Sequence, residues 1–293
     1  MRVSANCIRC LVDKQEERVQ KQSVNASKKA DYLKEVLCVI GQSDEETSAP
    51  ELVEDIAKVY ETYFGEEKDY HDIKAMHNQK MLEVEESIWQ RIQEADDAME
   101  RAILYARAGN YIDYGAMKHV DENILNDLLA NVEKEKLNEK CYREFLADID
   151  HAKRLVYVTD NCGEIVMDKQ LIRVLKEQYP KLQITVLVRG KQVLNDATME
   201  DAVQVGMTEL VPVMENGTGI AGTSLRHINK ESKYLLKEAD VIIAKGQGNF
   251  ESMYGCGLNI YYLFLCKCDF FATRFGLTKN AGVLMREGDY QQK

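Results

Sequence analysis

Acidic and amide side chains gather in short turns that each follow an apolar run of this chain. Asp160 and Asn161 come directly after the run 155–159 (LVYVT), and Asp196 lies a few residues beyond the run 184–188 (ITVLV). Carboxylate and amide oxygens are the ligands that hard divalent cations prefer. Because the carboxyl ends of parallel strands meet at one edge of a sheet, these three side chains predict a metal site there.

A third polar turn adds a positive charge. Lys245 follows the run 240–244 (DVIIA), and the segment 246–251 (GQGNFE) comes next. An ammonium group and the exposed N–H groups of glycines favour an anion. A metal ion and a lysine together would neutralise a phosphate ester and align an attacking water. We therefore expect phosphoryl chemistry, with Lys245, Asn249 and Glu251 on the phosphate side.

Each turn taken alone has a simpler explanation, because Asp and Asn after a strand commonly cap helices or form turns. Three such turns with compatible chemistry favour the metal site.

Glu164 has two open interpretations: it orients the attacking water, or it is a favourable acid in the first turn of a helix. Asp201 is predicted to be an acid on a helix surface. The segment Lys-Gly-x-Gly lacks the ending and spacing of a P-loop.

The elements that must position these turns change in character along the chain. Residues 1–150 show helical periodicity without strand alternation, whereas apolar runs and helical segments alternate in residues 151–293. This predicts an all-α amino-terminal domain and an α/β domain with a mostly parallel sheet. The expected strands are 155–159, 184–188, 209–213, 240–244 and 260–265.

The composition of the chain limits the kinds of partner and cellular location that we expect. The 293 residues carry a net charge of −11, which disfavours nucleic acid or an anionic membrane as the main partner. The apolar runs are too short to cross a bilayer, and no apolar signal segment opens the chain, so we expect a soluble cytoplasmic protein. The eight scattered cysteines are expected to be reduced thiols. Cys7 and Cys10 have the spacing of a metal-ligand or redox pair, and their role stays open.

The ordered set of motifs resembles the damage-control phosphatase family, first filed as a domain of unknown function. The motifs are Asp160-Asn161-x-Gly163-Glu164, Val188-Arg189-Gly190, Asn195-Asp196-Ala197-Thr198 and Lys245-Gly246-x-Gly248-Asn249-x-Glu251. The resemblance extends to Cys7-x-x-Cys10, as in the prokaryotic branch, and to Gly109-Asn110-x-Ile112-Asp113. It therefore spans nearly the whole chain.

The resemblance implies a metal-dependent phosphatase of small phosphorylated metabolites, built as a three-layer α/β/α sandwich with an attached helical domain. Asp160, Asn161 and Asp196 match the metal ligands of the family, and Lys245 matches its phosphate-contacting lysine. The implied metal is manganese, nickel, cobalt or magnesium. The helical domain would cover the substrate, with Asn110 and Asp113 lining the pocket.

Two other functions stay open. A carboxyl methyltransferase would bind S-adenosylmethionine at strand ends of the same kind of sheet, and a human member of the resembled family was reported as one. The turn after the first strand, however, is not glycine-rich, and the carboxylates would have no task. A sensor of phosphorylated metabolites, without catalysis, is the other alternative. The substrate and the oligomeric state are not indicated by the sequence.

Overall fold

A six-stranded sheet lies at the centre of the computed structural model, which describes residues 1–65, 69–109 and 129–289. Its strands run in the order β3-β2-β1-β4-β5-β6, and all neighbouring pairs are parallel except β5 and β6. The strands are β1 Arg154–Val158, β2 Gln183–Val188, β3 Val213–Glu215, β4 Val241–Lys245, β5 Ile260–Leu265 and β6 Gly282–Arg286. The expected α/β class is confirmed.

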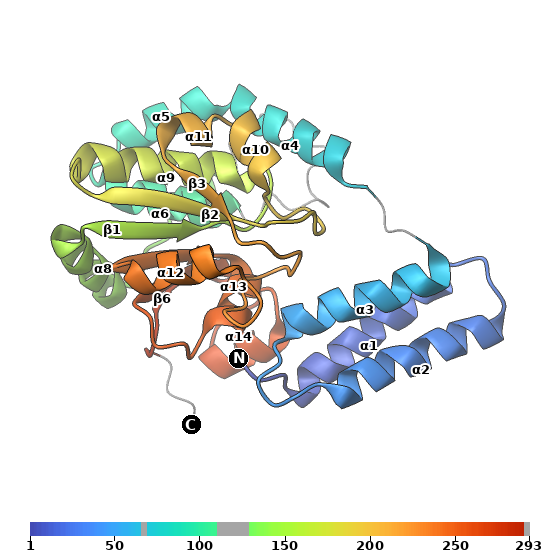
Figure 1. Ribbon diagram of the computed structural model, residues 1–293. Coiled ribbons are helices and arrows are strands. Elements are labelled where there is room, and N and C mark those ends of the chain that lie inside the picture. Colours follow the sequence, from blue (N-terminus) through green and yellow to red (C-terminus); the bar gives the residue numbers. More distant parts are fainter. Residues whose placement is uncertain (66–68, 110–128, 290–293) are drawn as a thin grey trace.

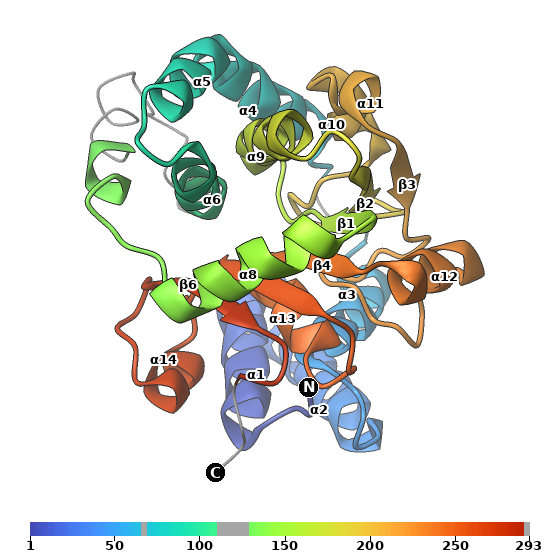
Figure 2. The same cartoon turned by 90° about the vertical axis from the view of Figure 1, so that its left-hand side faces the viewer.

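Helices cover both faces of this sheet (Figure 1). One face packs against α4 to α6 and α8 to α11, and the other against α12 to α14. The bounds are α4 His71–Glu83, α5 Glu85–Gln93, α6 Ala98–Ala108, α8 Glu139–His151, α9 Glu164–Gln178, α10 Met199–Gln204, α11 Met207–Leu210, α12 Lys230–Glu238, α13 Gly246–Met253 and α14 Asp269–Phe275. Figure 2 shows α6 and α9 side by side above the sheet.

The first three helices form their own small core. They are α1 Ala5–Gln20, α2 Ala26–Gln42 and α3 Ala49–Phe64. Tyr32 lies at the centre of this core and contacts the rings of Tyr60, Tyr63 and Phe64 edge-on. Contacts between α3 and α13 join this group to the rest of the molecule. The all-helical amino-terminal region is thus confirmed, while the division at residues 1–150 and 151–293 stays a prediction.

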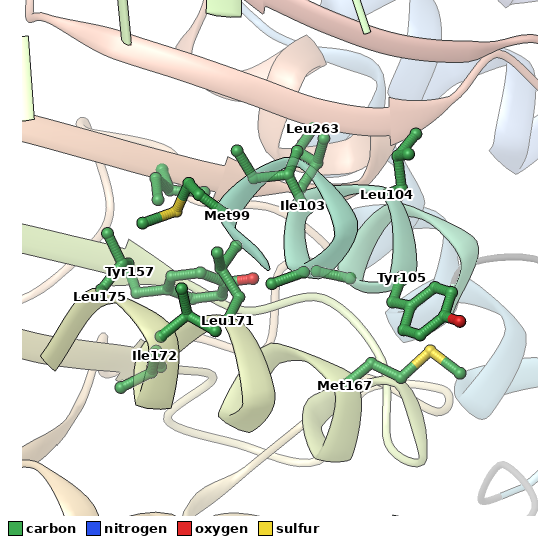
Figure 3. Close-up of a cluster of buried hydrophobic side chains, with 14 of the residues drawn as sticks. Met99, Ile103, Leu104, Tyr105, Tyr157, Met167, Leu171, Ile172, Leu175 and Leu263 are labelled. Carbon is green, nitrogen blue, oxygen red and sulfur yellow. The ribbon is translucent and has the colours of Figure 1, made fainter. Parts of the chain in front are cut away.

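The largest core lies between α6, α9 and the sheet (Figure 3). Tyr157 of β1 extends among Leu171 and Leu175 of α9, and Ile103 of α6 packs beside Leu263 of β5. Tyr157 is fully buried, and its hydroxyl donates to Asp168 Oδ1 at 2.8 Å. This core therefore ends in buried polar groups at the edge of the sheet where the polar turns lie.

Three local expectations need correction. The segment 209–213 is not a strand, because α11 extends to Leu210 and β3 begins only at Val213. The sequence predicts a helix over residues 223–236, but α12 begins only at Lys230, where the Asn229 side chain caps it by accepting from the N–H of Ser232. The antiparallel strand β6 was not expected. Among the described residues, no helix is both long and apolar enough to cross a membrane.

Candidate metal and phosphate site

The predicted site lies where the order of the strands reverses. β1 pairs with β2 on one side and with β4 on the other, so the chain leaves β1 and β4 next to each other at the same edge of the sheet. In sheets of this kind, ligands bind in the crevice at this switch point. The turn of Asp160 and Asn161 follows β1, and Gly246 follows β4. Both turns therefore face the crevice.

Two turns pair to bring the predicted metal ligands together. Asn161 and Asp196 form an isolated antiparallel bridge. The Cys162 N–H donates to Asn195 O at 2.8 Å, and the Ala197 N–H donates to Asp160 O at 2.7 Å. Backbone hydrogen bonds thus hold the turns 160–163 and 195–198 against each other, and the structure brings Asp160, Asn161 and Asp196 into one place.

The orientation of the Asn161 amide suits a cation ligand. Its Nδ2 donates to Asp160 Oδ2 at 2.8 Å and to Glu164 Oε2 at 3.1 Å. The reverse orientation would place the amide oxygen against two carboxylates. Because the nitrogen donates to both acids, Oδ1 is the atom that Asn161 could offer to a cation, and an oxygen is what a hard cation needs.

Arg189 lies behind the two aspartates and balances their charge. It directly follows β2, is fully buried, and donates from Nε to Asp196 Oδ2 at 2.6 Å. Its Nη1 donates to Thr223 and Asn249. Its Nη2 lies 3.8 Å from Asp160 Oδ1 and has no hydrogen-bond partner among the described residues. In the sequence Arg189 stands out only as part of the motif Val188-Arg189-Gly190, although a charged residue directly after a buried strand is a usable signal.

The site holds more negative charge than Arg189 alone compensates. Burial, and then the charges of Glu164 and Asp196, raise the pKa of Asp160 well above its ordinary value. Burial also raises the pKa of Asp196, although the adjacent Arg189 opposes the change. A bound cation would relieve this repulsion. Two carboxylates and one amide oxygen therefore fit a divalent metal, although the described residues hold no ready group of three His, Cys, Asp or Glu side chains.

Lys245 lies in a buried network on the other side of Glu164. Its Nζ is fully buried and donates to Glu164 Oε1 at 2.6 Å, Asp168 Oδ1 at 2.5 Å and Ala106 O at 2.7 Å. An ammonium group has three N–H donors, so all three have acceptors here. Although burial lowers the pKa of Lys245, the carboxylates of Asp168 and Glu164 raise it above its ordinary value overall. Burial raises the pKa of Asp168 to about 6, against the opposing effect of Lys245.

The other expected phosphate-side residues have different surroundings. Asn249 is fully buried, and its Nδ2 donates to Thr159 O at 2.9 Å and Lys245 O at 2.6 Å, so it ties the ends of β1 and β4 together. Glu251, in α13, accepts from Gln247 Nε2 at 2.6 Å and is not brought to the metal turns by any of these contacts. Asn110 and Asp113 lie outside the described residues.

Cys162 lies beside the aspartates but is not suited to be a nucleophile. Its side chain is buried, and burial raises the pKa of the thiol to about 12. A thiol reacts as the thiolate, so Cys162 is inert near neutral pH.

A second cluster, of Ser224, His227 and Glu51, joins the 224–227 loop to α3. Ser224 Oγ lies 3.2 Å from Nδ1 of His227, and Glu51 Oε1 lies 2.9 Å from the same nitrogen. A catalytic relay needs the hydroxyl and the carboxylate on opposite ring nitrogens. The cluster therefore joins two parts of the fold and does not form a hydrolytic triad.

Gly246 gives a direct test of how closely the two turns must approach. A Cβ atom at this position would lie 2.1 Å from Cγ of Asp160, and the backbone has φ +80°. We expect Gly246→Ala to cost about 1–2 kcal/mol for the left-handed backbone and a further 1–3 kcal/mol for the collision. Urea denaturation measures both costs.

The matched control is Gly255→Ala. Gly255 has φ +90°, and no described atom lies within 4 Å of a Cβ placed there. This variant should therefore lose only the part of the free energy of unfolding that comes from the left-handed backbone. Equal losses of stability in the two variants would show that Asp160 does not press against Gly246.

Comparison with known proteins extends over almost the whole chain. Residues 3–283 match the family model described as "Damage-control phosphatase ARMT1-like domain". An uncharacterized protein of Methanocaldococcus jannaschii is 28% identical over 98% of this chain and 96% of its own length. A protein of Archaeoglobus fulgidus named "Damage-control phosphatase" is 32% identical over 75% of this chain and 76% of its own length.

A solved structure has the same fold. The crystal structure of a DUF89 family protein from Pyrococcus horikoshii matches with a TM-score of 0.82 and 25% identity, covering 98% of this chain and 99% of that one. A "Damage-control phosphatase" of the same organism is 34% identical over 64% of each chain. The family model alone covers far more than half of the sequence. This chain belongs to the damage-control phosphatase ARMT1-like domain family.

Proposed function

We propose that this protein is a metal-dependent phosphatase that hydrolyses phosphate esters of small metabolites. The observation that carries the proposal is the meeting of Asp160, Asn161 and Asp196 at the switch point, with the buried Arg189 behind them. Two relatives, from Archaeoglobus fulgidus and Pyrococcus horikoshii, are named damage-control phosphatases, which supports the same reaction here. Sugar phosphates and damaged phosphorylated metabolites are the proposed substrate class.

The proposed metal ligands are Asp160, Asn161 and Asp196, and the proposed ions are manganese, nickel, cobalt and magnesium. The ion would supply positive charge to the phosphate and to the attacking oxygen. Arg189 holds Asp196 through Nε, and Glu164 holds the Asn161 amide in the orientation that presents its oxygen. The two turns thus hold the three proposed ligands in place before the substrate binds. A site that needs no rearrangement during the reaction is faster for that reason.

Glu164 and Lys245 could take part in the reaction only by giving up a hydrogen bond that they make in this structure. Glu164 engages Lys245 with one oxygen and Asn161 with the other, so orienting a water would require it to leave one partner. As the first residue of α9, it also has the favourable place of an acid in a first helical turn. Lys245 can contact a phosphate oxygen only by exchanging one of its three acceptors.

Release of inorganic phosphate tests the proposal. The purified protein is incubated with p-nitrophenyl phosphate and a panel of sugar phosphates, with each of the four ions and with EDTA. We expect turnover that needs a divalent ion and stops with the chelator. Stabilisation by S-adenosylmethionine without phosphate release would favour the methyltransferase instead. Stabilisation by phosphorylated metabolites without turnover would favour the sensor.

A further inference from the structure

The inward face of α4 is polar where a core helix is usually apolar. Lys74, His77 and Asn78 are buried together with Met81, and Asn78 is fully inaccessible. Lys and Asn are seldom buried unless specific partners hold them. The partners of Lys74 and Asn78 lie on the two turns that carry the proposed metal ligands or in the segments next to the second turn.

The Asn78 side chain contacts one of these turns and the helix that follows the other. Its Oδ1 accepts the N–H of Gly163 at 2.7 Å, two residues after Asn161. Its Nδ2 donates to Asp201 Oδ1 and to Gln204 Oε1, each at 2.8 Å. Gly163 has φ +70° and stands at the start of α9, while Asp201 stands in the first turn of α10. One amide therefore joins the segment of Asp160 and Asn161 to the segment that follows Asp196.

Asp201 in turn is hydrogen-bonded to Thr198, the last residue of the second turn. Its Oδ2 accepts from the N–H of Thr198 at 2.8 Å and from Thr198 Oγ1 at 2.9 Å. Lys74 Nζ lies 2.7 Å from the same oxygen and also donates to Gln192 Oε1. Asp201 is only 3% exposed, so the expectation of an acid on a helix surface was wrong. Its capping bonds and its ion pair with Lys74 keep it in place.

The geometry points to Asn78 as a positioning residue that sets the spacing between the turns 160–163 and 195–198, with the Lys74–Asp201 pair as its support. Asn78 is not itself a proposed ligand. It acts on the backbone of one turn and on the cap of the other, and groups that orient metal ligands in this way are worth about 10–100-fold in metal affinity. The consequence for catalysis rests on the proposed function, whereas the spacing of the turns does not.

Asn78→Asp is the first test, because it keeps the size and the acceptor for Gly163 but removes both donors. We expect faster hydrogen exchange in peptides covering 158–165 and 194–201, and about 10–100-fold weaker Mn²⁺ binding by calorimetry. The metal concentration for half-maximal phosphate release should rise with it. Thermal melting is recorded for every variant; if Asn78→Asp does not fold, Asn78→Ser receives the same measurements.

A charge swap and a neighbouring control separate positioning from general stability. Asn78→Asp combined with Asp201→Asn returns a donor facing an acceptor, so the double variant should bind Mn²⁺ more tightly than the two single effects combined predict. Gln79→Glu adds the same charge at an exposed position of α4 and should leave exchange and binding unchanged.

Unchanged exchange in both peptides of the Asn78 variant would overturn the inference, whatever the protein catalyses. So would additive effects in the double variant. If the wild-type protein releases no phosphate while the exchange changes are found, the proposed function fails and the positioning role stands.

Discussion

Asparagine in place of Asp160 should lower metal-dependent phosphate release by at least about a hundredfold, because one of the two negatively charged side chains among the proposed ligands is lost. The same variant should be more stable than the wild-type protein when metal is absent. Burial and the charges of Glu164 and Asp196 already disfavour the ionised carboxylate, and a neutral amide removes that repulsion. Sites built for chemistry commonly lower the stability of the fold in this way.

Asp196→Asn should lose activity to a similar extent but change stability in the opposite direction. Asp196 is the close partner of Arg189, with 2.6 Å between Nε and Oδ2, and both side chains are almost inaccessible. Removing its charge leaves the guanidinium with only the more distant Asp160. Breaking a buried pair on one side costs on the order of 3 kcal/mol, so the two variants separate the catalytic role from the structural one.

Urea denaturation with and without Mn²⁺ measures both effects. At a metal concentration of 100 times Kd, the wild-type protein should gain about 2.7 kcal/mol, and both variants should gain much less. Asp13→Asn is the control, since Asp13 is exposed on α1 and pairs only with Arg9 among the described residues. Full turnover in Asp160→Asn, or an unchanged stabilisation by Mn²⁺, would contradict the assignment of Asp160 as a ligand.

Asp160, Asn161 and Asp196 could be placed together from the sequence, because the turns that carry them come after apolar runs and parallel strands end at a common edge. Residue type and position along the chain were enough for this step. The pairing of the two turns through Ala197 and Cys162 adds precision that no local pattern contains.

Asn78 and Lys74 could not be found in the same way. Their shared partner, Asp201, lies more than a hundred residues further along the chain, and nothing local indicates that α4 reaches the turns. One signal was available: Lys74, Asn78 and Met81 have the spacing of a single helix face. Polar residues at buried positions of a helix are informative because burial is costly unless they have partners.

Lys245 was expected to follow a buried strand and proves to be the last residue of β4, and the sequence did not indicate the direction of its side chain. Its three acceptors come from two helices: Ala106 near the end of α6, and Glu164 and Asp168 on α9. Glu164 and Asp168 are one helical turn apart and therefore lie on the same face of α9. That this face meets an ammonium group depends on how α9 packs on β4, which is a property of the whole sheet.

Lys245→Met should therefore lower the free energy of unfolding by about 3–5 kcal/mol, because it leaves two carboxylates in the core without their cation. Lys245 and both acids are at most 1% exposed. Adding Glu164→Gln and Asp168→Asn should recover most of the loss, since neutral amides need no counter-charge. Equal stability of Lys245→Met and the wild-type protein would show that this network does not hold the fold.

Kinetics on the folded fraction of the same variant decide between the two roles of the lysine. If Nζ leaves an acceptor to grip the phosphate, KM should rise and inhibition by inorganic phosphate should weaken, while the metal requirement stays the same. If Lys245 only holds Glu164, and through it the Asn161 amide, KM should be retained and the metal requirement should rise instead. The two outcomes differ because an ammonium group that touches the substrate changes its binding, whereas one that acts through Asn161 changes the cation site.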